Sequence, residues 1–117
     1  MGCVTTQPQL AVIQALVDDA VARGATLHIG GTLGGGAAGA AGPLFYPPTV
    51  LSGVTPEMRI AREEVFGPVL SILRVPGDSD AAAAALANAT PFGLGATVWS
   101  RDPARAHRLA SQVWRGW

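Results

Sequence analysis

The chain has 117 residues, and its eight basic and eight acidic side chains give a formal net charge of zero at pH 7. That balance excludes the basic footprint of a protein that binds nucleic acid or an anionic membrane. One cysteine and two histidines exclude a disulfide framework and a zinc cluster, so no metal site is expected.

Apolar residues make up 49% of the sequence, but many of them are alanine, which buries little area per residue. A chain of this length is one small domain or a piece of a larger one. We therefore expect it to need a partner surface. No apolar run is long enough to cross a bilayer and the N-terminus lacks a secretory pattern, which predicts a cytoplasmic protein.

The first half of the chain predicts a helix, a strand, a glycine-rich loop and a second extended segment. Thr6 resembles a helix N-cap with Pro8 in the first turn, apolar residues recur at helical spacing, and Gly24 supplies the stop. Residues 26–29 are typical of a short strand. A glycine-rich loop occupies 30–43, and the prolines in 47–51 confine the next extended segment to a sheet edge or to the start of a strand.

The second half of the chain predicts further helices and strands in alternation. A helical turn is expected at 56–60, and a strand at 69–75 whose nearly continuous apolar character is typical of a sheet covered on both faces. Asp78 or Ser79 can cap a helix through residue 89, and 96–100 form a further predicted strand. Asp102 begins a last helix that carries Val113 and ends at Gly116.

Alternating helices and strands predict an α/β layered architecture. The chain stops just past a helix, where such a fold would supply its next strand, and it begins just as abruptly. We therefore interpret the sequence as part of a larger domain that is incomplete at both ends.

Two glycine-containing motifs can each be interpreted either as a functional signal or as a feature without function. The start, MGCVTT, fits a myristoylation signal with Cys3 available for a second acyl chain, but no polybasic stretch follows it. Gly34, Gly36 and Gly39 fit the spacing of a dinucleotide-binding loop, but Pro43 and an extended segment follow instead of a helix. Chance and a flexible surface loop are the favoured interpretations.

The other candidate residues are also better explained by structure. Cys3 could be a nucleophile, but the sequence offers it no nearby base, so an inert thiol is favoured. His28 lies in a strand pattern and His107 on the polar face of a helix. The acid pairs 18–19 and 78/80 are explained by helix capping and solvation.

The stretch AREEVFGPVL at 61–70 leaves two alternatives open. If it is extended, side chains alternate in direction, so Glu64 and Phe66 lie on the same side. A carboxylate beside an aromatic ring on one face suits a sugar diol attached to a flat heterocycle. The alternative is the solvated start of a strand, since charged side chains are mostly exposed.

Three blocks of the sequence together resemble one known family. The segments QLAVIQALVDDAVARGATLHIGG, YPPTVLSGVTPEMRIAREEVFGPVLSI and ALANATPFGLGATVWSRDPARAHRLA follow one another through essentially the whole chain. They resemble the C-terminal portion of the aldehyde dehydrogenase catalytic domain. The resemblance implies that residues 1–117 are a partial three-layer αβα catalytic domain from an NAD(P)-dependent enzyme that oxidises an aldehyde to a carboxylic acid.

The resemblance also implies roles for single residues. Glu64 matches the glutamate that holds the nicotinamide ribose hydroxyls, and Phe66 matches the aromatic residue that contacts the nicotinamide side. Gly67 and Pro68 shape the turn into the next strand. Structural roles are expected for three residues of the later block, namely Asn88, Gly93 and Leu94.

Several parts of the family pattern are missing from the sequence, and this limits the activity expected of the chain. In the family the nucleophilic cysteine and the base glutamate lie upstream of the residues present, and Cys3 does not match the nucleophile. The Rossmann cofactor domain is also expected to be absent from this chain. We therefore expect a cofactor contact without catalytic residues, an inactive isolated chain, and homo-oligomers in the full-length family. The alternative is a catalytically dead interaction module that docks onto a full-length dehydrogenase subunit.

Overall fold

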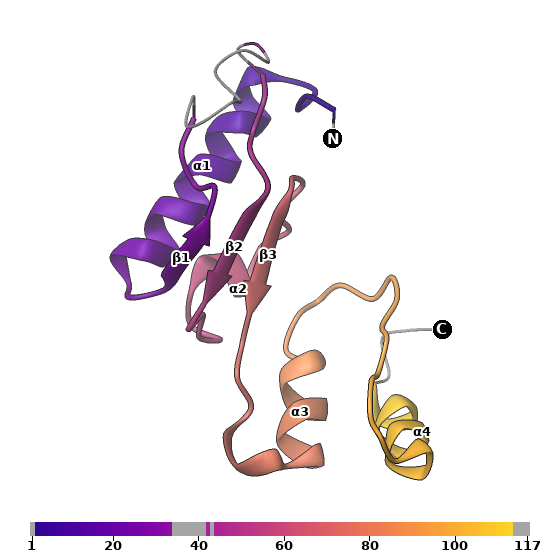
Figure 1. Ribbon diagram of the computed structural model, residues 1–117. Helices are drawn as coiled ribbons and strands as arrows, with labels where there is room; N and C mark the ends of the chain where they lie inside the picture. Colours follow the sequence, from indigo (N-terminus) through magenta and orange to yellow (C-terminus); the bar gives the residue numbers. More distant parts are fainter. Residues whose placement is uncertain (1, 34–41, 43, 114–117) are drawn as a thin grey trace. The chain divides into compact units, whose positions relative to one another are not determined.

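The computed structural model describes residues 2–33, 42 and 44–113, and these divide into two compact units, residues 1–74 and 75–117. The elements of the first unit are α1 (Gln7–Ala22), β1 (Thr26–Ile29), β2 (Thr49–Ser52), α2 (Arg59–Arg62) and β3 (Val69–Ile72). The second unit contains a 3-10 turn (Pro76–Asp78), α3 (Asp80–Ala87) and α4 (Pro103–Gln112) (Figure 1). The α/β class predicted from the sequence is confirmed.

Local sequence signals determine both ends of α1. The Thr6 hydroxyl accepts a hydrogen bond from the Gln9 backbone N–H, which satisfies one of the free donors of the first turn. At the other end Gly24 has a φ of +100°, its N–H donates to Val21, and the N–H of Ala25 donates to Ala20. This is a Schellman ending, and it requires a residue without a Cβ at the left-handed position.

The sheet of the first unit has the order β1-β2-β3 (Figure 1). β1 pairs antiparallel with β2, with an irregularity in register between Leu27 and Ile29, whereas β2 pairs parallel with β3. Of the two positions predicted for Pro47 and Pro48, the start of a strand is confirmed, whereas the sheet edge is wrong. Both prolines precede the strand, so they remove no ladder donor and β2 can be central.

The core of the first unit lies between α1 and one face of the sheet. Leu51 of β2 is fully buried in one cluster with the buried side of α1, and Thr49, two residues earlier on the strand, is also buried. The buried residues of α1 recur at helical spacing: Leu10, Ile13, Leu16, Val17 and Ala20. This face of the sheet is covered by a helix layer of the same unit.

The opposite face of the sheet is open. Leu70 and Ile72 of β3 are 59% and 41% exposed, and alternate with the half-buried Val69 and Ser71. The prediction of a strand covered on both faces and reaching residue 75 is wrong for this chain, because β3 ends at Ile72 and buries only one side. The predicted turn at 56–60 also lies further along, since α2 begins at Arg59.

In the second unit, the two helices begin where the sequence predicts. The Ser79 hydroxyl caps α3 by accepting from Ala82, and the Asp102 carboxylate caps α4 by accepting from Ala104. Asn88, which follows α3, donates from its side chain to the Gln112 carbonyl at 2.9 Å. This bond ties the ends of the two helices together, which agrees with a structural role for Asn88.

The predicted strand at 96–100 is wrong, because these residues form neither helix nor strand. A strand requires a neighbour that accepts and donates ladder hydrogen bonds, and no described segment pairs with this one. Trp99 in its middle is 90% exposed. The last helix is also shorter than predicted, with Val113 as its C-cap, and Gly116 lies outside the described residues.

Candidate functional site

The segment between α2 and β3 makes two tight turns before the strand begins. The Gly67 N–H donates to the Val65 carbonyl at 2.8 Å, and the Val69 N–H donates to the Gly67 carbonyl at 2.8 Å. Each bond spans three residues, so the turns are centred on Phe66 and Pro68. Pro68 suits its position, since it has no N–H to leave unpaired.

The two adjacent glutamates lie in different environments. Glu63 ends α2 and forms a two-pronged ion pair with Arg59, with N–O distances of 2.7 and 3.0 Å. The hydrogen bonds and charge of Arg59 lower the pKa of Glu63 below its usual value. Glu64 is exposed, and no hydrogen bond or ion pair to another described residue involves its carboxylate. Both acids are exposed, but only Glu64 has a carboxylate that no described residue already binds.

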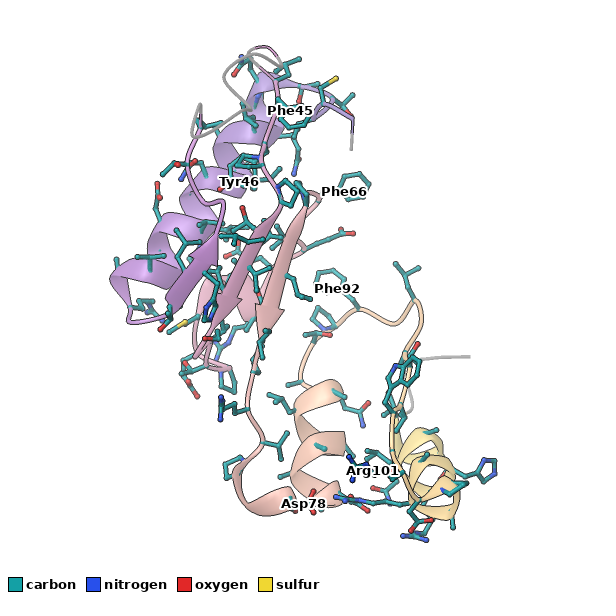
Figure 2. All side chains as sticks on the ribbon, viewed as in Figure 1. Phe45, Tyr46, Phe66, Asp78, Phe92 and Arg101 are labelled. Atoms are coloured by element: carbon teal, nitrogen blue, oxygen red, sulfur yellow. The ribbon has the colours of Figure 1, made fainter. Side chains whose placement is uncertain are left out.

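Phe66 is presented to solvent rather than packed. Its side chain is 71% exposed, and Figure 2 shows the ring projecting outward from the turn. Val65, between Glu64 and Phe66, is half-buried and packs against the core of the first unit. Glu64 and Phe66 are thus exposed residues on either side of a residue that contacts the core.

A shallow hollow of about 460 Å³ adjoins the Phe66 ring. One wall is the turn from Val65 to Pro68, and the other is the N-terminal segment from Gly2 to Thr5, with Gln9 of α1 also lining it. The N-terminal segment is held by the backbone bond from the Val4 N–H to the Leu44 carbonyl, at 2.8 Å. The hollow gives a flat group a place to lie against the ring.

Gly67 brings the turn into close contact with α1. A Cβ on Gly67 would collide with Cδ1 of Ile13 and lie only 2.9 Å from its Cγ1. Ile13 is fully buried, so it has little room to move aside. The backbone at Gly67 can lie this close to the helix only because the residue has no side chain.

The turn offers a carboxylate acceptor and an exposed aromatic ring. A carboxylate without a described partner can accept hydrogen bonds from both hydroxyls of a ribose. An exposed aromatic ring beside a hollow can pack on a flat heterocycle. Glu64 and Phe66 are both exposed and so are available for such contacts.

The other candidates do not gather around Glu64. Cys3 is an exposed free thiol on the far wall of the hollow, and none of the described contacts supplies it with a base. His28 contacts the Ser52 hydroxyl at 2.7 Å on the open face of the sheet, and His107 lies exposed on α4. These positions give no nucleophile-and-base pair involving Cys3 among the described residues.

The two acid pairs are occupied by structural contacts. Asp18 accepts a hydrogen bond from Gln14 at 2.8 Å, and Asp19 lies 3.8 Å from Arg23. Asp78 and Asp80 both bind Arg105, at 2.7 and 2.6 Å. Ion pairing thus adds to the predicted capping and solvation. Among the described residues, no group of three or more histidine, cysteine or acidic side chains could hold a metal ion.

Two further sequence predictions concern the loop and the membrane. Gly34, Gly36 and Gly39 lie outside the described residues, as do most others of the glycine-rich stretch at 30–43. None of the described helices is both long enough and apolar enough to cross a bilayer.

Two components of the site were not predicted from the sequence. The N-terminal segment forms one wall of the hollow, and the Gln9 side chain donates to the Phe66 carbonyl at 3.4 Å across 57 residues of sequence. Gln9 lies four residues before Ile13 and so on the same side of α1. This spacing shows in the sequence that Gln9 and Ile13 share one side of α1. It does not show that the turn at 65–68 lies against that side.

Comparison with known proteins identifies the family. Residues 1–116 match the model of the aldehyde dehydrogenase family. A Mycolicibacterium smegmatis protein, provisionally named a succinate-semialdehyde dehydrogenase [NADP(+)], is 43% identical over 99% of this chain and 21% of its own length. Vanillin dehydrogenase of Pseudomonas fluorescens is 48% identical over 89% of this chain and 20% of its own length.

A solved structure agrees with these relatives. The NAD-dependent aldehyde dehydrogenase of Sinorhizobium meliloti is 41% identical and superimposes with a TM-score of 0.83, over 97% of this chain and 21% of that one. The chain thus spans about a fifth of the length of the proteins it matches. The resemblance found in the sequence is confirmed: the chain belongs to the aldehyde dehydrogenase family.

Proposed function

We propose that the chain is part of an NAD(P)-dependent aldehyde dehydrogenase, to which it contributes the contact with the nicotinamide ribose. In this proposal Glu64 accepts hydrogen bonds from the ribose hydroxyls and Phe66 lies against the nicotinamide. The substrate is an aldehyde, and NAD or NADP is the cofactor. The full-length enzyme is a cytoplasmic homo-oligomer in which residues 1–117 belong to the catalytic domain.

One contrast carries the proposal. Glu63 is held by Arg59, whereas its neighbour Glu64 is exposed, has no described partner and lies two residues from an exposed ring. An aromatic side chain normally stabilises a fold by being buried, so a ring that is 71% exposed contributes little to folding. Ligand binding explains why an acid and a ring are both left accessible here.

In this proposal Glu64 and Phe66 orient the cofactor and do not themselves react. When bound, the nicotinamide accepts a hydride from the substrate. Glu64 would restrict rotation of the ribose through two hydrogen bonds, and Phe66 would restrict tilting of the ring. Such positioning accelerates a reaction only if the reacting groups are also held in place. By resemblance, the nucleophile and the base belong to parts of the enzyme upstream of these residues.

The test uses nicotinamide mononucleotide, which carries the ring and ribose but not the adenine half. Binding to the full chain is followed by NMR shifts of the backbone amides. Glu64→Gln keeps the shape of the side chain but removes its charge, and Glu63→Gln makes the same change at the neighbouring acid. Glu64→Gln should weaken binding about tenfold, as expected for loss of a charge-assisted hydrogen bond, and Glu63→Gln should not change it.

The proposal is overturned if the two variants bind equally well, or if the nucleotide shifts amides away from residues 64–67. Phe66→Leu provides a second variant, since it keeps an apolar side chain but removes the aromatic face. It should weaken binding without affecting the fold, because the ring is mostly exposed.

We also propose that the isolated chain has no dehydrogenase activity. The assay measures NADH or NADPH formation with aldehydes and the purified 117-residue chain. No turnover is expected. Turnover that survives Cys3→Ala and is lost in Glu64→Ala would contradict this, because it would show a complete active site that does not use the only cysteine present.

The open face of the sheet favours a second candidate function. Leu70 and Ile72 are exposed apolar side chains on β3, and β1 and β3 are edge strands. A catalytically inactive module could cover this face by docking onto a full-length dehydrogenase subunit. Size-exclusion chromatography of the chain, alone and with a full-length homologue, distinguishes this candidate by the appearance of a mixed complex.

A further inference from the structure

The position of the Phe66 ring cannot come from its own packing. Side chains in a protein core are held by close contacts on all sides, but this ring is 71% exposed. Rotation about its side-chain bonds is therefore limited mainly by the backbone to which it is attached. Whatever holds that backbone also determines where the ring can lie.

Two residues of α1 hold the backbone on either side of the ring's attachment. The Gln9 amide donates to the Phe66 carbonyl at 3.4 Å, and Ile13 packs against the Cα of Gly67. The two residues are one helical turn apart and so project from the same side of α1. Gln9 therefore contacts the peptide group that joins Phe66 to Gly67, and Ile13 contacts Gly67 itself.

We propose that α1 positions the Phe66 turn through Gln9 and Ile13, with Gln9 as a positioning residue for the ring. Ile13 sets how closely the turn approaches the helix, and the Gln9 hydrogen bond sets the orientation of the peptide plane between Phe66 and Gly67. Its consequence for nucleotide binding rests on the proposed function, whereas the orientation itself does not.

The role of Gln9 can be tested with a nearly isosteric change. In Gln9→Glu the ionised side chain is an acceptor only, so it cannot donate to the Phe66 carbonyl and is repelled by it. A protonated carboxyl group can donate again, and a glutamate protonates near its ordinary pKa of about 4.3. The variant thus removes the bond at neutral pH and restores it in acid.

The readout is the amide resonance of Gly67, whose nitrogen belongs to the same peptide group as the Phe66 carbonyl. In the full chain without nucleotide, Gln9→Glu should displace this resonance at pH 7 and return it toward the unsubstituted position below about pH 4. Ala11→Glu is the matched control, because it adds the same charge to an exposed position of α1. The control should leave Gly67 unchanged at both pH values.

The proposal is overturned if Gln9→Glu leaves the Gly67 resonance in place, or if Ala11→Glu displaces it equally. A displacement that persists unchanged in acid also overturns it, since it would not depend on a donated hydrogen bond. Thermal unfolding midpoints of both variants should match the unsubstituted chain, because neither position is buried.

A separate measurement connects the turn with the ligand. Gln9→Glu should weaken binding of nicotinamide mononucleotide at pH 7 about fivefold, the usual effect of one neutral hydrogen bond. If the Gly67 resonance responds as expected but the unsubstituted chain binds no nucleotide, the positioning role stands and the proposed function fails. If the nucleotide binds but Gly67 does not respond, the positioning role alone fails.

Discussion

The two compact units of the chain are stabilised in different ways. The first unit, residues 1–74, buries side chains from α1, the sheet and the connecting segments in one core. Among the described residues of the second unit, 75–117, only Ala84 is an apolar residue classed as buried. Its two helices are instead joined by polar contacts, chiefly those of Arg105.

Arg105 is the centre of those contacts. From α4 it binds Asp80 at 2.6 Å, the Asp78 carboxylate at 2.7 Å and the Asp78 backbone carbonyl at 3.0 Å. Asp78 has a φ of +54°, in the left-handed region that few residues other than glycine adopt. Apolar burial thus stabilises the unit that carries Glu64 and Phe66, whereas ion pairs and helix caps stabilise the other.

The largest expected effect is the loss of a core side chain from the first unit. Leu51→Ala removes a fully buried side chain from the central strand and leaves a cavity, which should cost about 3 kcal/mol. Hydrogen exchange of amides in each unit during urea unfolding measures where the loss falls. Leu109→Ala, at a half-buried position of α4, should cost about 1 kcal/mol.

A similar cost for both substitutions would show that the second unit depends on apolar packing as much as the first. A loss of protection confined to the first unit in Leu51→Ala would show that the two units are stabilised independently.

The next effect concerns the contact between Gly67 and α1. Gly67→Ala would place a methyl group against buried Ile13, and overpacking of this kind costs about 1–3 kcal/mol. Ile13→Val removes the Cδ1 atom involved in the collision, so the double variant should be more stable than the sum of the two single effects predicts. Chemical denaturation of all four proteins measures this coupling.

Strictly additive effects in that cycle would contradict the contact. They would show that the turn moves away from α1 at no cost, and hence that core packing does not constrain the candidate site.

The smallest effect is electrostatic and belongs to the second unit. Arg105 lowers the pKa of Asp78 below its usual value through hydrogen bonds and charge. A lowered pKa in the folded state stabilises the fold above the unfolded value, about 3.9 for aspartate, and this stabilisation is lost as the pH falls through the folded value. Amide protection in α3 and α4 should therefore decrease as the pH is lowered below about 4.

Arg105→Gln tests the source of this dependence. The variant should weaken amide protection in α3 and α4 at neutral pH and remove the part of the acid response that Asp78 contributes. Arg59→Gln is the control in the first unit. It breaks a pair exposed on both sides, and such pairs contribute little, so it should change protection in the first unit hardly at all. Equal effects in both units would contradict a special role for Arg105.

Much of the fold could be read from local signals. The caps at Thr6, Ser79 and Asp102, and the stop at Gly24, act through hydrogen bonds or backbone conformation within a few residues, so they are visible in the sequence. The apolar face of α1 follows from its helical spacing for the same reason. The resemblance to aldehyde dehydrogenases predicted the family, and with it Glu64 and Phe66 as the candidate contact.

Other features depended on which segments meet in space. The strand predicted at 96–100 does not form because a ladder requires a neighbour, and the alternation of apolar residues cannot supply one. The central place of β2 depends on pairing with both β1 and β3, which the two prolines before it could not predict, since they allowed either a sheet edge or the start of a strand. The open face of β3 likewise depends on what lies beside it, and not on its own apolar character.

The candidate site likewise combines features that are visible in the sequence with features that arise only from packing. An acid and an aromatic ring two positions apart are visible in the residue order alone, and so is a possible pair between Arg59 and Glu63, because these two residues are four apart. The tertiary structure left the Phe66 ring exposed and packed Val65 against the core. It also brought Gln9 and Ile13 of α1 against the turn, since contacts across more than fifty residues arise from packing and not from local sequence.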